Sequence, residues 1–463
     1  MVNIALVQPT RNLGIRYTGD LGLAYISAYL KNNRYRVRTF DASSSYSTTS
    51  AAKMVMDIAD FVPEHILVKV WGFDYKSPNW IIEALKGKVK RKTNFIIGGQ
   101  TATIRPEKSL NLTGADVGII GDAIPLIYSV LHGEMSKKGV IYNQNGEVIN
   151  NGEAELNPDN WPTPDLSDIR IRENGTAPLV SSVGCNHSRC SFCFLKEHPR
   201  RIKFRSIEKV VNDIESINQR WGIRHFYFYD DNFLNDPRRA EELAEAINEE
   251  MSFSFESRAE SVLKSEKYLQ RAKHKIRRID IGVESFLSSQ LERWVKGTTP
   301  QTNLDAINRL IALGIIPGMY MISADEQTDL NELNQTIDFF KENPFILFFL
   351  RNINRFQDHE QGPKEYPKYI NVFQFALSEM ASFFSKRYVL ENILARIKRD
   401  KSLESLGSFG LKEQTKNYLN SIISLVRLVE EGSKNEEEAK DEARVLGIEL
   451  AKNLQSVNSS LRD

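Results

Sequence analysis

Cysteine is scarce in this sequence, and long hydrophobic runs are missing altogether. Only three of the 463 residues are cysteines, and so few, in an odd number, cannot form a disulfide framework. The longest apolar runs, such as FILFFL at 345–350, are far too short to cross a bilayer. The first residues, MVNIALVQPTRN, have no basic region followed by a long apolar stretch, so no signal peptide is expected. These absences predict a cytoplasmic protein without a membrane segment.

An excess of charge of either sign is also lacking. The chain carries 61 basic and 60 acidic residues, for a formal net charge of +1. This balance gives no sign of a nucleic-acid-binding surface or of a preference for acidic substrates. A hydrophobic content of 41% over 463 residues is enough for a sizeable core in two or three domains.

Residues 1–140 are expected to form an α/β domain. Short apolar, β-branched runs alternate with stretches of helical periodicity, which predicts a parallel sheet. Helices on both faces would make it a doubly wound, Rossmann-like domain, which binds ligands at the carboxyl ends of its strands. The predicted strands are Ile4–Val7, Val37–Phe40, Ile66–Val70, Phe95–Ile97 and Val117–Ile120.

A second α/β domain is expected at 179–350. Residues 141–178 precede it, and their many Asn, Asp, Pro and Gly residues predict a linker of turns. The strand–helix repeats that follow are too few for a complete eight-fold barrel and predict a partial (β/α)6 barrel of the TIM type, with functional groups at the carboxyl ends of its strands. Residues 351–463 are mostly helical in pattern and are expected to form a C-terminal cap. The predicted strands of the barrel are Leu179–Val183, His225–Tyr229, Ser252–Glu256, Arg278–Gly282, Ile316–Ile322 and Ile346–Leu350.

All three cysteines, Cys185, Cys190 and Cys193, lie within nine residues in the motif GCNHSRCSFC. The motif follows the first predicted strand of the second domain, which places the thiols in a loop at the carboxyl end of that strand. Three thiolates can hold three irons of a [4Fe–4S] cluster and leave the fourth iron open. The amino and carboxylate groups of S-adenosylmethionine can fill that open position, and one-electron reduction then cleaves its C–S bond. The motif thus indicates an oxygen-sensitive cluster that works with S-adenosylmethionine.

A zinc site is the alternative that the spacing leaves open. Three cysteines and His187 would satisfy a tetrahedral site. However, His187 lies between two of the cysteines and would close the tetrahedron only with strain, and zinc sites more often show paired CxxC units. The spacing therefore favours the cluster over zinc.

The cysteine loop resembles the signature of radical S-adenosylmethionine enzymes, which is C-x3-C-x2-C with an aromatic residue before the last cysteine. Phe192 fills the aromatic position, which in that family flanks the adenine of S-adenosylmethionine. The sequence departs from the signature because four residues, and not three, separate Cys185 from Cys190.

Further segments resemble the same family in the same order. HFYFYDDNFL (225–234) is similar to the second-strand segment, where Asp231 is implied to help position S-adenosylmethionine. ESRAE (256–260) resembles the third-strand segment, whose arginine, here Arg258, would pair with the carboxylate of S-adenosylmethionine.

Two more matches follow. IDIGVESFLSSQLERWVKGTT (279–299) is similar to a block in which Glu284 would contact the ribose or the amino group of S-adenosylmethionine. GMYMISADEQTDLNELNQTIDFF (318–340) resembles the fifth strand and its helix, with Ser-Ala-Asp-Glu-Gln where the family usually has Gly-x-Pro-Gly-Glu.

Each of these residues also has a structural explanation. An arginine such as Arg258 at a strand end is often only solvated, Glu284 could anchor a loop through backbone N–H groups, and Asp231 could cap the next helix. Their ordered succession at one barrel rim favours the functional interpretation.

The first domain resembles the cobalamin-binding domain that precedes the barrel in one large subgroup of radical S-adenosylmethionine enzymes. The resemblance rests on segments 20–40 and 95–122. Paired glycines at a strand end would allow a ligand to approach the backbone closely. The residues implied to contact cobalamin are Thr10, Gly98, Gly99, Gln100 and Asp122.

One cobalamin signature is missing from this domain. The motif D-x-H-x-x-G, whose histidine replaces the lower base of the cobalt, does not occur, and neither His65 nor His132 fits it. The alternative is a Rossmann-like domain that has kept its fold and lost its corrinoid.

Together the resemblances imply a cobalamin-dependent radical enzyme. Reductive cleavage of S-adenosylmethionine would yield a 5′-deoxyadenosyl radical that abstracts hydrogen from an unactivated carbon, and cobalamin would deliver a methyl group to that carbon. The implied partners are a small-molecule or peptide substrate and an external one-electron donor such as flavodoxin or ferredoxin. Two alternatives stay open: a radical enzyme without cobalamin that performs cyclisation, dehydrogenation or rearrangement, and a zinc- or corrinoid-binding protein without catalytic activity.

Overall fold

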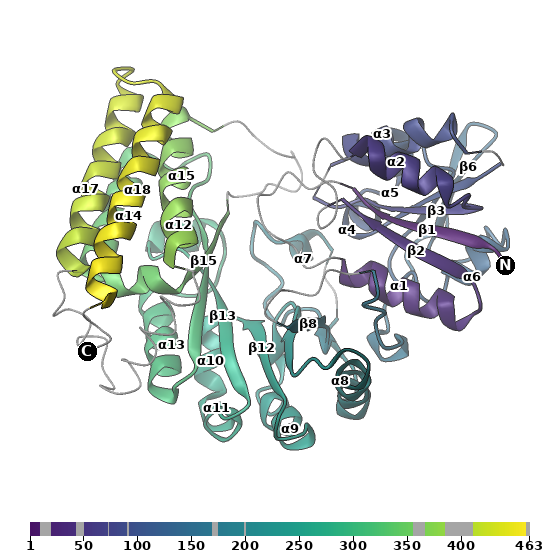
Figure 1. Ribbon diagram of the computed structural model, residues 1–463, viewed down its shortest axis with the longest axis horizontal. Coiled ribbons are helices and arrows are strands. Elements are labelled where there is room, and N and C mark those ends of the chain that lie inside the picture. The colour runs from purple at the N-terminus through teal and green to yellow at the C-terminus, as the bar shows by residue number, and fades with distance from the viewer. Residues whose placement is uncertain are drawn as a thin grey trace. The chain divides into compact units, whose positions relative to one another are not determined.

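Two units make up the protein in a computed structural model (Figure 1). Unit 1 comprises Met1–Val183 and Lys203–Tyr229, and unit 2 comprises Gly184–Ile202 and Asp230–Asp463. The first part of the predicted barrel therefore groups with the N-terminal residues, whereas the cysteine loop belongs to unit 2. The structure describes residues 1–9, 20–42, 51–72, 74–89, 92–168, 175–198, 201–354, 366–384 and 411–459.

Unit 1 is built on a seven-stranded sheet with the order β2-β1-β3-β4-β5-β6-β7. The first five strands run parallel, as predicted, and the last two are antiparallel. Because β1 lies between β2 and β3, the direction in which strands are added reverses at β1. The strands are β1 (Asn3–Gln8), β2 (Arg36–Asp41), β3 (His65–Lys69), β4 (Asn94–Gly98), β5 (Val117–Ile119), β6 (Val140–Gln144) and β7 (Glu147–Asn150).

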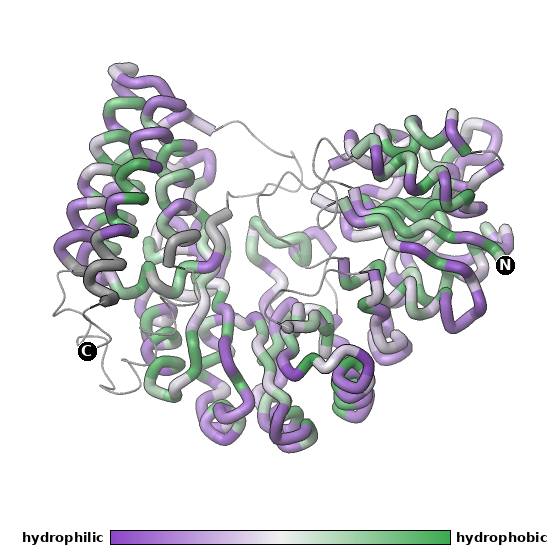
Figure 2. The backbone as a smooth tube through the Cα atoms, viewed as in Figure 1, coloured by the Kyte–Doolittle hydropathy of each residue, from purple (hydrophilic) through white to green (hydrophobic). Residues whose placement is uncertain are grey.

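Helices cover both faces of this sheet, because each central strand is apolar on both sides. In β1, Ile4 and Leu6 join the core under α1 and α6, whereas Ala5 and Val7 join the core under α2, α3 and α5. The central strands of this sheet are accordingly mostly hydrophobic in Figure 2. The doubly wound α/β fold is confirmed. The helices are α1 (Leu21–Asn32), α2 (Ala51–Asp60), α3 (Lys76–Lys86), α4 (Gln100–Ile104), α5 (Pro106–Thr113) and α6 (Ile127–Leu131).

A β-hairpin occupies the first part of the stretch for which the sequence predicts only turns. Asn145 and Gly146 connect β6 to β7, and both have positive φ, 52° and 87°. A two-residue Asn-Gly connection with this backbone matches the right-handed twist of a hairpin. The turn-forming residues in 141–178 therefore include those of a tight turn between two strands, and not only those of an irregular loop.

The remaining segments of unit 1 hold the beginning of the predicted barrel. β8 and β11 pair in parallel, and β9 and β10 pair antiparallel. Arg205, which is only 1% exposed, donates to the Asp213 carboxylate at 2.5 Å. The same guanidinium donates to the carbonyl oxygen of Trp161, whose ring packs on Tyr25 of α1 with 5.0 Å between centroids. The elements are η2 (Pro158–Asn160), β8 (Thr176–Leu179), β9 (Ser182–Val183), β10 (Lys203–Phe204), α8 (Ile207–Trp221) and β11 (His225–Phe228).

Unit 2 contains four consecutive parallel strands, paired in the order β12-β13-β14-β15. With β8 and β11 they make six parallel strands, the number predicted for the partial barrel. The first of them, β8, begins at Thr176 and ends at Leu179, so it lies mostly in the predicted linker and not at Leu179–Val183. The strands are β12 (Ser252–Ser257), β13 (Ile276–Glu284), β14 (Ile316–Ile322) and β15 (Leu350–Asn354). The helices between and before them are α7 (Phe194–Glu197), η3 (Phe233–Asn235), α9 (Arg239–Ala246), α10 (Ala259–Lys264), α11 (Glu266–Ala272), α12 (Ser288–Arg293), α13 (Pro300–Leu313) and α14 (Leu330–Glu342).

The predicted strand Ile346–Leu350 is wrong. Residues Pro344–Phe349 form the 3-10 helix η4, and β15 begins only at Leu350. Proline at the first helical position has the φ that a helix needs, and a short apolar run does not distinguish a strand from a buried helical turn.

The C-terminal region is helical, as expected. Three long helices pack against one another, and α17 also contacts α14 (Figure 1). Among the described residues, no helix is both long and apolar enough to span a membrane. The helices are α15 (Lys368–Phe384), α17 (Leu411–Glu430) and α18 (Glu436–Ser459).

Replacing Asp213 by asparagine is expected to destabilise unit 1. The change keeps the size of the side chain but removes the carboxylate that the buried Arg205 guanidinium binds, and breaking a buried ion pair typically costs about 3–5 kcal/mol. Urea denaturation of the variant and the wild type measures the difference in free energy of unfolding. Asp57→Asn is the matched control, because Asp57 pairs with Lys53 at the surface, where the loss is expected to be below about 1 kcal/mol. Equal losses in the two variants would contradict this role for Asp213.

Candidate functional site

The cysteine loop begins directly after β9, and residues 231–235 hold its start in place. The backbone N–H of Gly184 donates to Asp231 Oδ2 at 2.7 Å, and Asn235 Nδ2 donates to the Gly184 carbonyl at 2.7 Å. Asn235 Oδ1 also accepts from the N–H of Asn186 at 3.0 Å. Asp231 therefore orients the loop that carries Cys185, and its carboxylate is committed to a backbone donor.

Asn232 connects the loop to the carboxyl end of β12. Its side chain is fully buried, and Nδ2 donates to Asn186 Oδ1 at 3.3 Å. Its Oδ1 accepts from Ser257 Oγ at 2.8 Å and from the N–H of Arg258 at 3.3 Å. This one amide thus fixes the cysteine loop relative to the segment in which the sequence predicted a cofactor-binding arginine.

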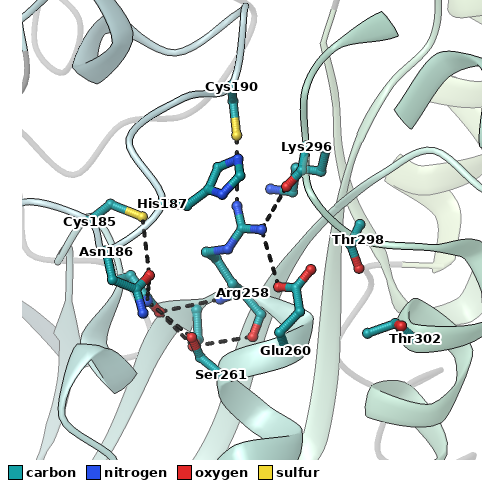
Figure 3. A network of polar contacts seen from close by, with 12 residues as sticks. Cys185, Asn186, His187, Cys190, Arg258, Glu260, Ser261, Lys296, Thr298 and Thr302 are labelled. Atoms are coloured by element: carbon teal, nitrogen blue, oxygen red, sulfur yellow. Dashed lines mark hydrogen bonds and ion pairs between the residues drawn. The ribbon is translucent and has the colours of Figure 1, made fainter. Parts of the chain in front are cut away.

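Arg258 lies against the cysteine loop, as Figure 3 shows. It is 8% exposed, and Nη1 is 3.7 Å from Cys190 Sγ. Nη2 donates to the carbonyl oxygen of Lys296 at 2.6 Å and lies 3.3 Å from Glu260 Oε2. The guanidinium is therefore a buried cation whose charge is balanced by one carboxylate and directed at one cysteine sulfur.

Glu284 and Lys296 form a second ion pair at the end of β13. Glu284 Oε1 is 3.1 Å from Lys296 Nζ, and both side chains are nearly buried. Glu284 has a φ of 64°, which is uncommon for a residue with a side chain. The pair lies over Gly282, where an added Cβ would come within 2.7 Å of Glu284 Oε1 and 2.9 Å of Lys296 Nζ. A glycine is required there for the two charges to meet.

Phe192, the aromatic residue of the signature, lies between this ion pair and a buried tryptophan. Lys296 Nζ is 5.7 Å from the centre of its ring, a cation–π contact. Trp294 meets the ring edge-on, with 6.4 Å between centroids and an angle of 87°. The predicted S-adenosylmethionine residues Phe192, Arg258 and Glu284 are thus linked by contacts through Lys296, which the sequence analysis did not single out.

The donor set of the loop suits an iron–sulfur cluster. All three cysteines are free, Cys190 is buried, and the other two are partly exposed. Burial raises the pKa of the Cys193 thiol to about 12. Burial also raises the pKa of Cys190, against the opposing effect of the nearby Lys296 and Arg258 cations. Such thiols ionise when a metal binds, and the two cations would stabilise the negative charge of an iron–sulfur cluster held by thiolates.

His187 presents only its Nδ1 as a possible metal ligand. Its Nε2 is 2.7 Å from the carbonyl oxygen of Val295, and since a carbonyl only accepts, this nitrogen carries a hydrogen. Burial lowers the pKa of His187. Among the described residues, no three His, Cys, Asp or Glu side chains converge closely enough to ligate a single ion.

Three of the predicted cobalamin residues, Gly98, Gly99 and Gln100, lie where β4 ends and α4 begins in unit 1. Gly99 has a φ of 106°, and an added Cβ would lie 2.9 Å from the carbonyl oxygen of Val70 after β3. Gly98 ends β4, and Gln100 begins α4. Thr10 falls outside the described residues.

Asp122 has a structural role in unit 1. It is 4% exposed, and Oδ2 accepts from Trp161 Nε1 at 2.9 Å and from the N–H of Asn157 at 3.3 Å. Its Oδ1 accepts from the N–H of Ile124 at 3.1 Å. Asp122 therefore holds the segment around Trp161 against the end of β5.

Several residues of the site were missed from the sequence. Lys296 lies in segment 279–299, which resembles the radical S-adenosylmethionine family, and its positive charge could have indicated a role in the site. Asn232 and Asn235 follow a predicted strand, a position at which an asparagine is as typical of a helix cap as of a functional site. Trp294 had no signal, since an apolar residue at a helix end is most often part of a core.

Comparison with known protein families agrees with this geometry. The profile of the Radical SAM superfamily matches residues 179–340. The 4'-phospho-dehydrooxetanocin synthase of Priestia megaterium is 27% identical over 238 residues, which are 45% of this chain and only 32% of the synthase. An uncharacterized methyltransferase of Pyrococcus horikoshii is 25% identical over 368 residues, or 74% of this chain and 78% of that protein.

Solved structures share the fold over most of the chain. The cobalamin-dependent S-adenosylmethionine radical enzyme OxsB, with aqua-cobalamin and S-adenosylmethionine bound, superimposes with a TM-score of 0.68 and 19% identity, covering 100% of this chain and 81% of OxsB. The radical S-adenosylmethionine methyltransferase TsrM from Kitasatospora setae gives a TM-score of 0.57 and 16% identity, covering 76% and 73% of the two chains. Residues 179–340 therefore match the Radical SAM superfamily, and the chain shares its fold with the cobalamin-dependent radical enzyme OxsB.

Proposed function

We propose that this chain is a cobalamin-dependent radical S-adenosylmethionine enzyme that methylates an unactivated carbon of a small-molecule or peptide substrate. The observation that carries the proposal is the arrangement around Cys190, which lies in a loop with two further free cysteines. The buried guanidinium of Arg258 faces the Cys190 sulfur at 3.7 Å. An external one-electron donor such as flavodoxin or ferredoxin would supply the reductant.

Cys185, Cys190 and Cys193 would hold the [4Fe–4S] cluster. When bound, the cluster supplies the electron that cleaves the C–S bond of S-adenosylmethionine, and cobalamin supplies the methyl group. The hydrogen bond from Arg258 to Cys190 Sγ withdraws charge from the sulfur, and hydrogen bonds of this kind tune a cluster's potential.

S-adenosylmethionine would be bound by Phe192, Arg258 and Glu284. Asp231 would orient the cysteine loop through its hydrogen bond with the backbone N–H of Gly184. The Glu284 carboxylate would receive the ribose or the amino group, and the Phe192 ring would flank the adenine. Arg258 and Lys296 already have carboxylate partners in the chain, so the carboxylate of the ligand would be added to balanced ion pairs. The cost of burying this third carboxylate is lowered because two cations are close to it.

Cobalamin would bind at the carboxyl edge of the unit 1 sheet. With the strand order β2-β1-β3-β4-β5, ligands are expected where the chain reverses direction, between the ends of β1 and β3. Gln8, at the end of β1, is 2% exposed, and its Oε1 has no hydrogen-bond partner in the described part of the chain. An amide donor of the corrin ring would satisfy that oxygen, and Gly98, Gly99 and Gln100 would allow close approach to the backbone.

A radical enzyme without cobalamin is the second candidate, and Asp122 favours it. Its carboxylate accepts hydrogen bonds from Trp161 Nε1 and from the N–H groups of Asn157 and Ile124, all of which belong to unit 1. A domain that has lost its ligand keeps contacts of this kind. Such an enzyme would perform a cyclisation, dehydrogenation or rearrangement.

Radical chemistry is tested by the formation of 5′-deoxyadenosine. Protein reconstituted anaerobically with iron and sulfide, then given S-adenosylmethionine and a strong reductant, is expected to release 5′-deoxyadenosine that mass spectrometry quantifies. A variant with Cys185, Cys190 and Cys193 all changed to alanine is the control and should form none. Equal amounts from both proteins, or none from a fully loaded wild type, would contradict the proposed reaction.

Glu284→Gln is expected to weaken the binding of S-adenosylmethionine roughly 10-fold or more, because hydrogen bonds to a charged group contribute about 1.5–3 kcal/mol. Equilibrium dialysis of the reconstituted protein with labelled S-adenosylmethionine measures the affinity. Glu260→Gln is the matched control, since Glu260 also balances a buried cation of the site but has no proposed contact with the ligand. If the two variants lose affinity equally, Glu284 acts only through the net charge.

Cobalamin binding is tested separately from radical chemistry. Anaerobically purified protein is mixed with hydroxocobalamin and desalted, and cobalt and iron are measured by mass spectrometry. We expect stoichiometric cobalt together with about four irons per chain. Iron without cobalt would favour the enzyme without cobalamin, and a single zinc would favour the non-catalytic alternative.

A further inference from the structure

The additional residue between Cys185 and Cys190 lengthens the loop and must be accommodated. One more residue adds up to about 3.3–3.6 Å of chain when extended. In the structure the additional length is taken up by a turn, because Ser188 has a φ of 44° and its hydroxyl donates to the carbonyl oxygen of Cys185. This turn leaves the His187 ring directed at the segment that follows α12.

Three consecutive backbone carbonyls of that segment receive donors from the site. The carbonyl of Trp294 accepts from the N–H of Ser191 at 2.9 Å, and the carbonyl of Val295 accepts from His187 Nε2 at 2.7 Å. The carbonyl of Lys296 accepts from Arg258 Nη2 at 2.6 Å. We call these three groups the 294–296 carbonyls. They hold the loop on both sides of Cys190 and also hold the cation that faces its sulfur.

The backbone of this segment is shaped for that contact. Val295 has a φ of 51°, an unfavourable conformation for a β-branched residue. Gly297 has a φ of 68°, and an added Cβ would lie 2.5 Å from His187 Cε1 and within 3.3 Å of both ring nitrogens. The His187 ring therefore lies on the face of Gly297 from which a side chain would project, and only glycine leaves it room.

Side-chain hydrogen bonds to Asp325 also fix this segment. Trp294 is fully buried, and its Nε1 donates to Asp325 Oδ2 at 2.6 Å. Arg293 donates to both oxygens of the same carboxylate, at 2.6 and 2.9 Å. Asp325 belongs to the Ser-Ala-Asp-Glu-Gln sequence that replaces the usual family motif, so this departure has a structural use. Anchored in this way, the 294–296 carbonyls form a rigid surface for the loop.

We propose that His187 is a positioning residue for the iron–sulfur cluster: seated on Gly297, it donates to the Val295 carbonyl and holds the four-residue spacer so that Cys190 stays against Arg258. The inference rests on the cluster site proposed above. It makes His187 part of the support of the loop. His187 is then neither a ligand of the cluster nor a general acid in the reaction. The longer spacer, Gly297 and the strained Val295 then belong to one arrangement.

The test compares how firmly the cluster is held in His187→Ala, His187→Gln, Gly297→Ala and the double variant His187→Ala/Gly297→Ala. Each protein is reconstituted anaerobically, and iron per chain, the rate of iron loss to a chelator and the electron paramagnetic resonance spectrum of the reduced cluster are recorded. No step of this test needs a substrate, cobalamin or turnover.

His187→Ala is expected to load iron but to lose it roughly 10- to 100-fold faster, as is typical when a group supporting a metal ligand is removed. Glutamine can donate from Nε2 and should restore much of the retention. Gly297→Ala should resemble His187→Ala, since its Cβ displaces the ring. The double variant should be no worse than either single one, because both changes remove the same contact.

Two matched controls separate this contact from general effects. Gly314→Ala introduces the same left-handed strain, at a φ of 77°, where an added Cβ meets nothing within 4 Å. His274→Ala removes a comparable histidine contact to a backbone carbonyl, that of Arg271 at 3.0 Å, before the amino end of β13. Both should retain iron like the wild type.

Three results would overturn the inference while leaving the proposed cluster in place. Wild-type retention and spectrum in His187→Ala would show that the contact does not position the cluster. Losses that multiply in the double variant would show that His187 and Gly297 act separately. Failure of His187→Gln to restore retention, together with lower iron loading in His187→Ala, would identify His187 as a ligand. A wild type that holds no iron would instead refute the proposed cluster itself, and the inference with it.

Discussion

The buried charge of Arg258 is the constraint on which the rest of the site depends. A guanidinium that is 8% exposed requires partners for its hydrogen-bond donors and a compensating charge. It has Glu260 for the charge, the Lys296 carbonyl for one donor and the sulfur of Cys190 for another. Satisfying one cation thus brings together the end of β12, the segment that follows α12 and the cysteine loop.

The same requirement favours amides at Asn232 and Asn235, two of the residues that hold the loop. Asn232 and Asn235 connect backbone and side-chain groups on three segments without adding charge beside two buried cations and three thiols. An aspartate in either position would supply only acceptors and would leave the donated hydrogen bonds unmade. The charged residues of the site are instead paired with one another, as Glu284 is with Lys296.

The sequence allowed the α/β fold, the cysteine loop and the order of the strand-end residues to be predicted, because each has a local signal. Alternation of apolar runs with helical periodicity marks β1 to β5, and the cluster of cysteines marks the loop. What could not be predicted depends on contacts between distant segments. Asn232 and Trp294 act through backbone groups far away in the chain, and nothing in their own neighbourhoods indicates this. η4 was mistaken for a strand because six apolar residues fit either structure.

The hairpin that follows β5 also changes what the sheet of unit 1 presents to solvent. β5 is apolar and fully buried, and a parallel sheet that ended there would offer a flat row of unpaired backbone groups to other chains. β6 covers that row, and the outermost strand becomes β7, four residues long with Glu147 and Asn150 exposed at its ends. Short, polar edge strands resist edge-to-edge association. The Asn-Gly turn thus gives this domain the short polar edge that protects it against aggregation.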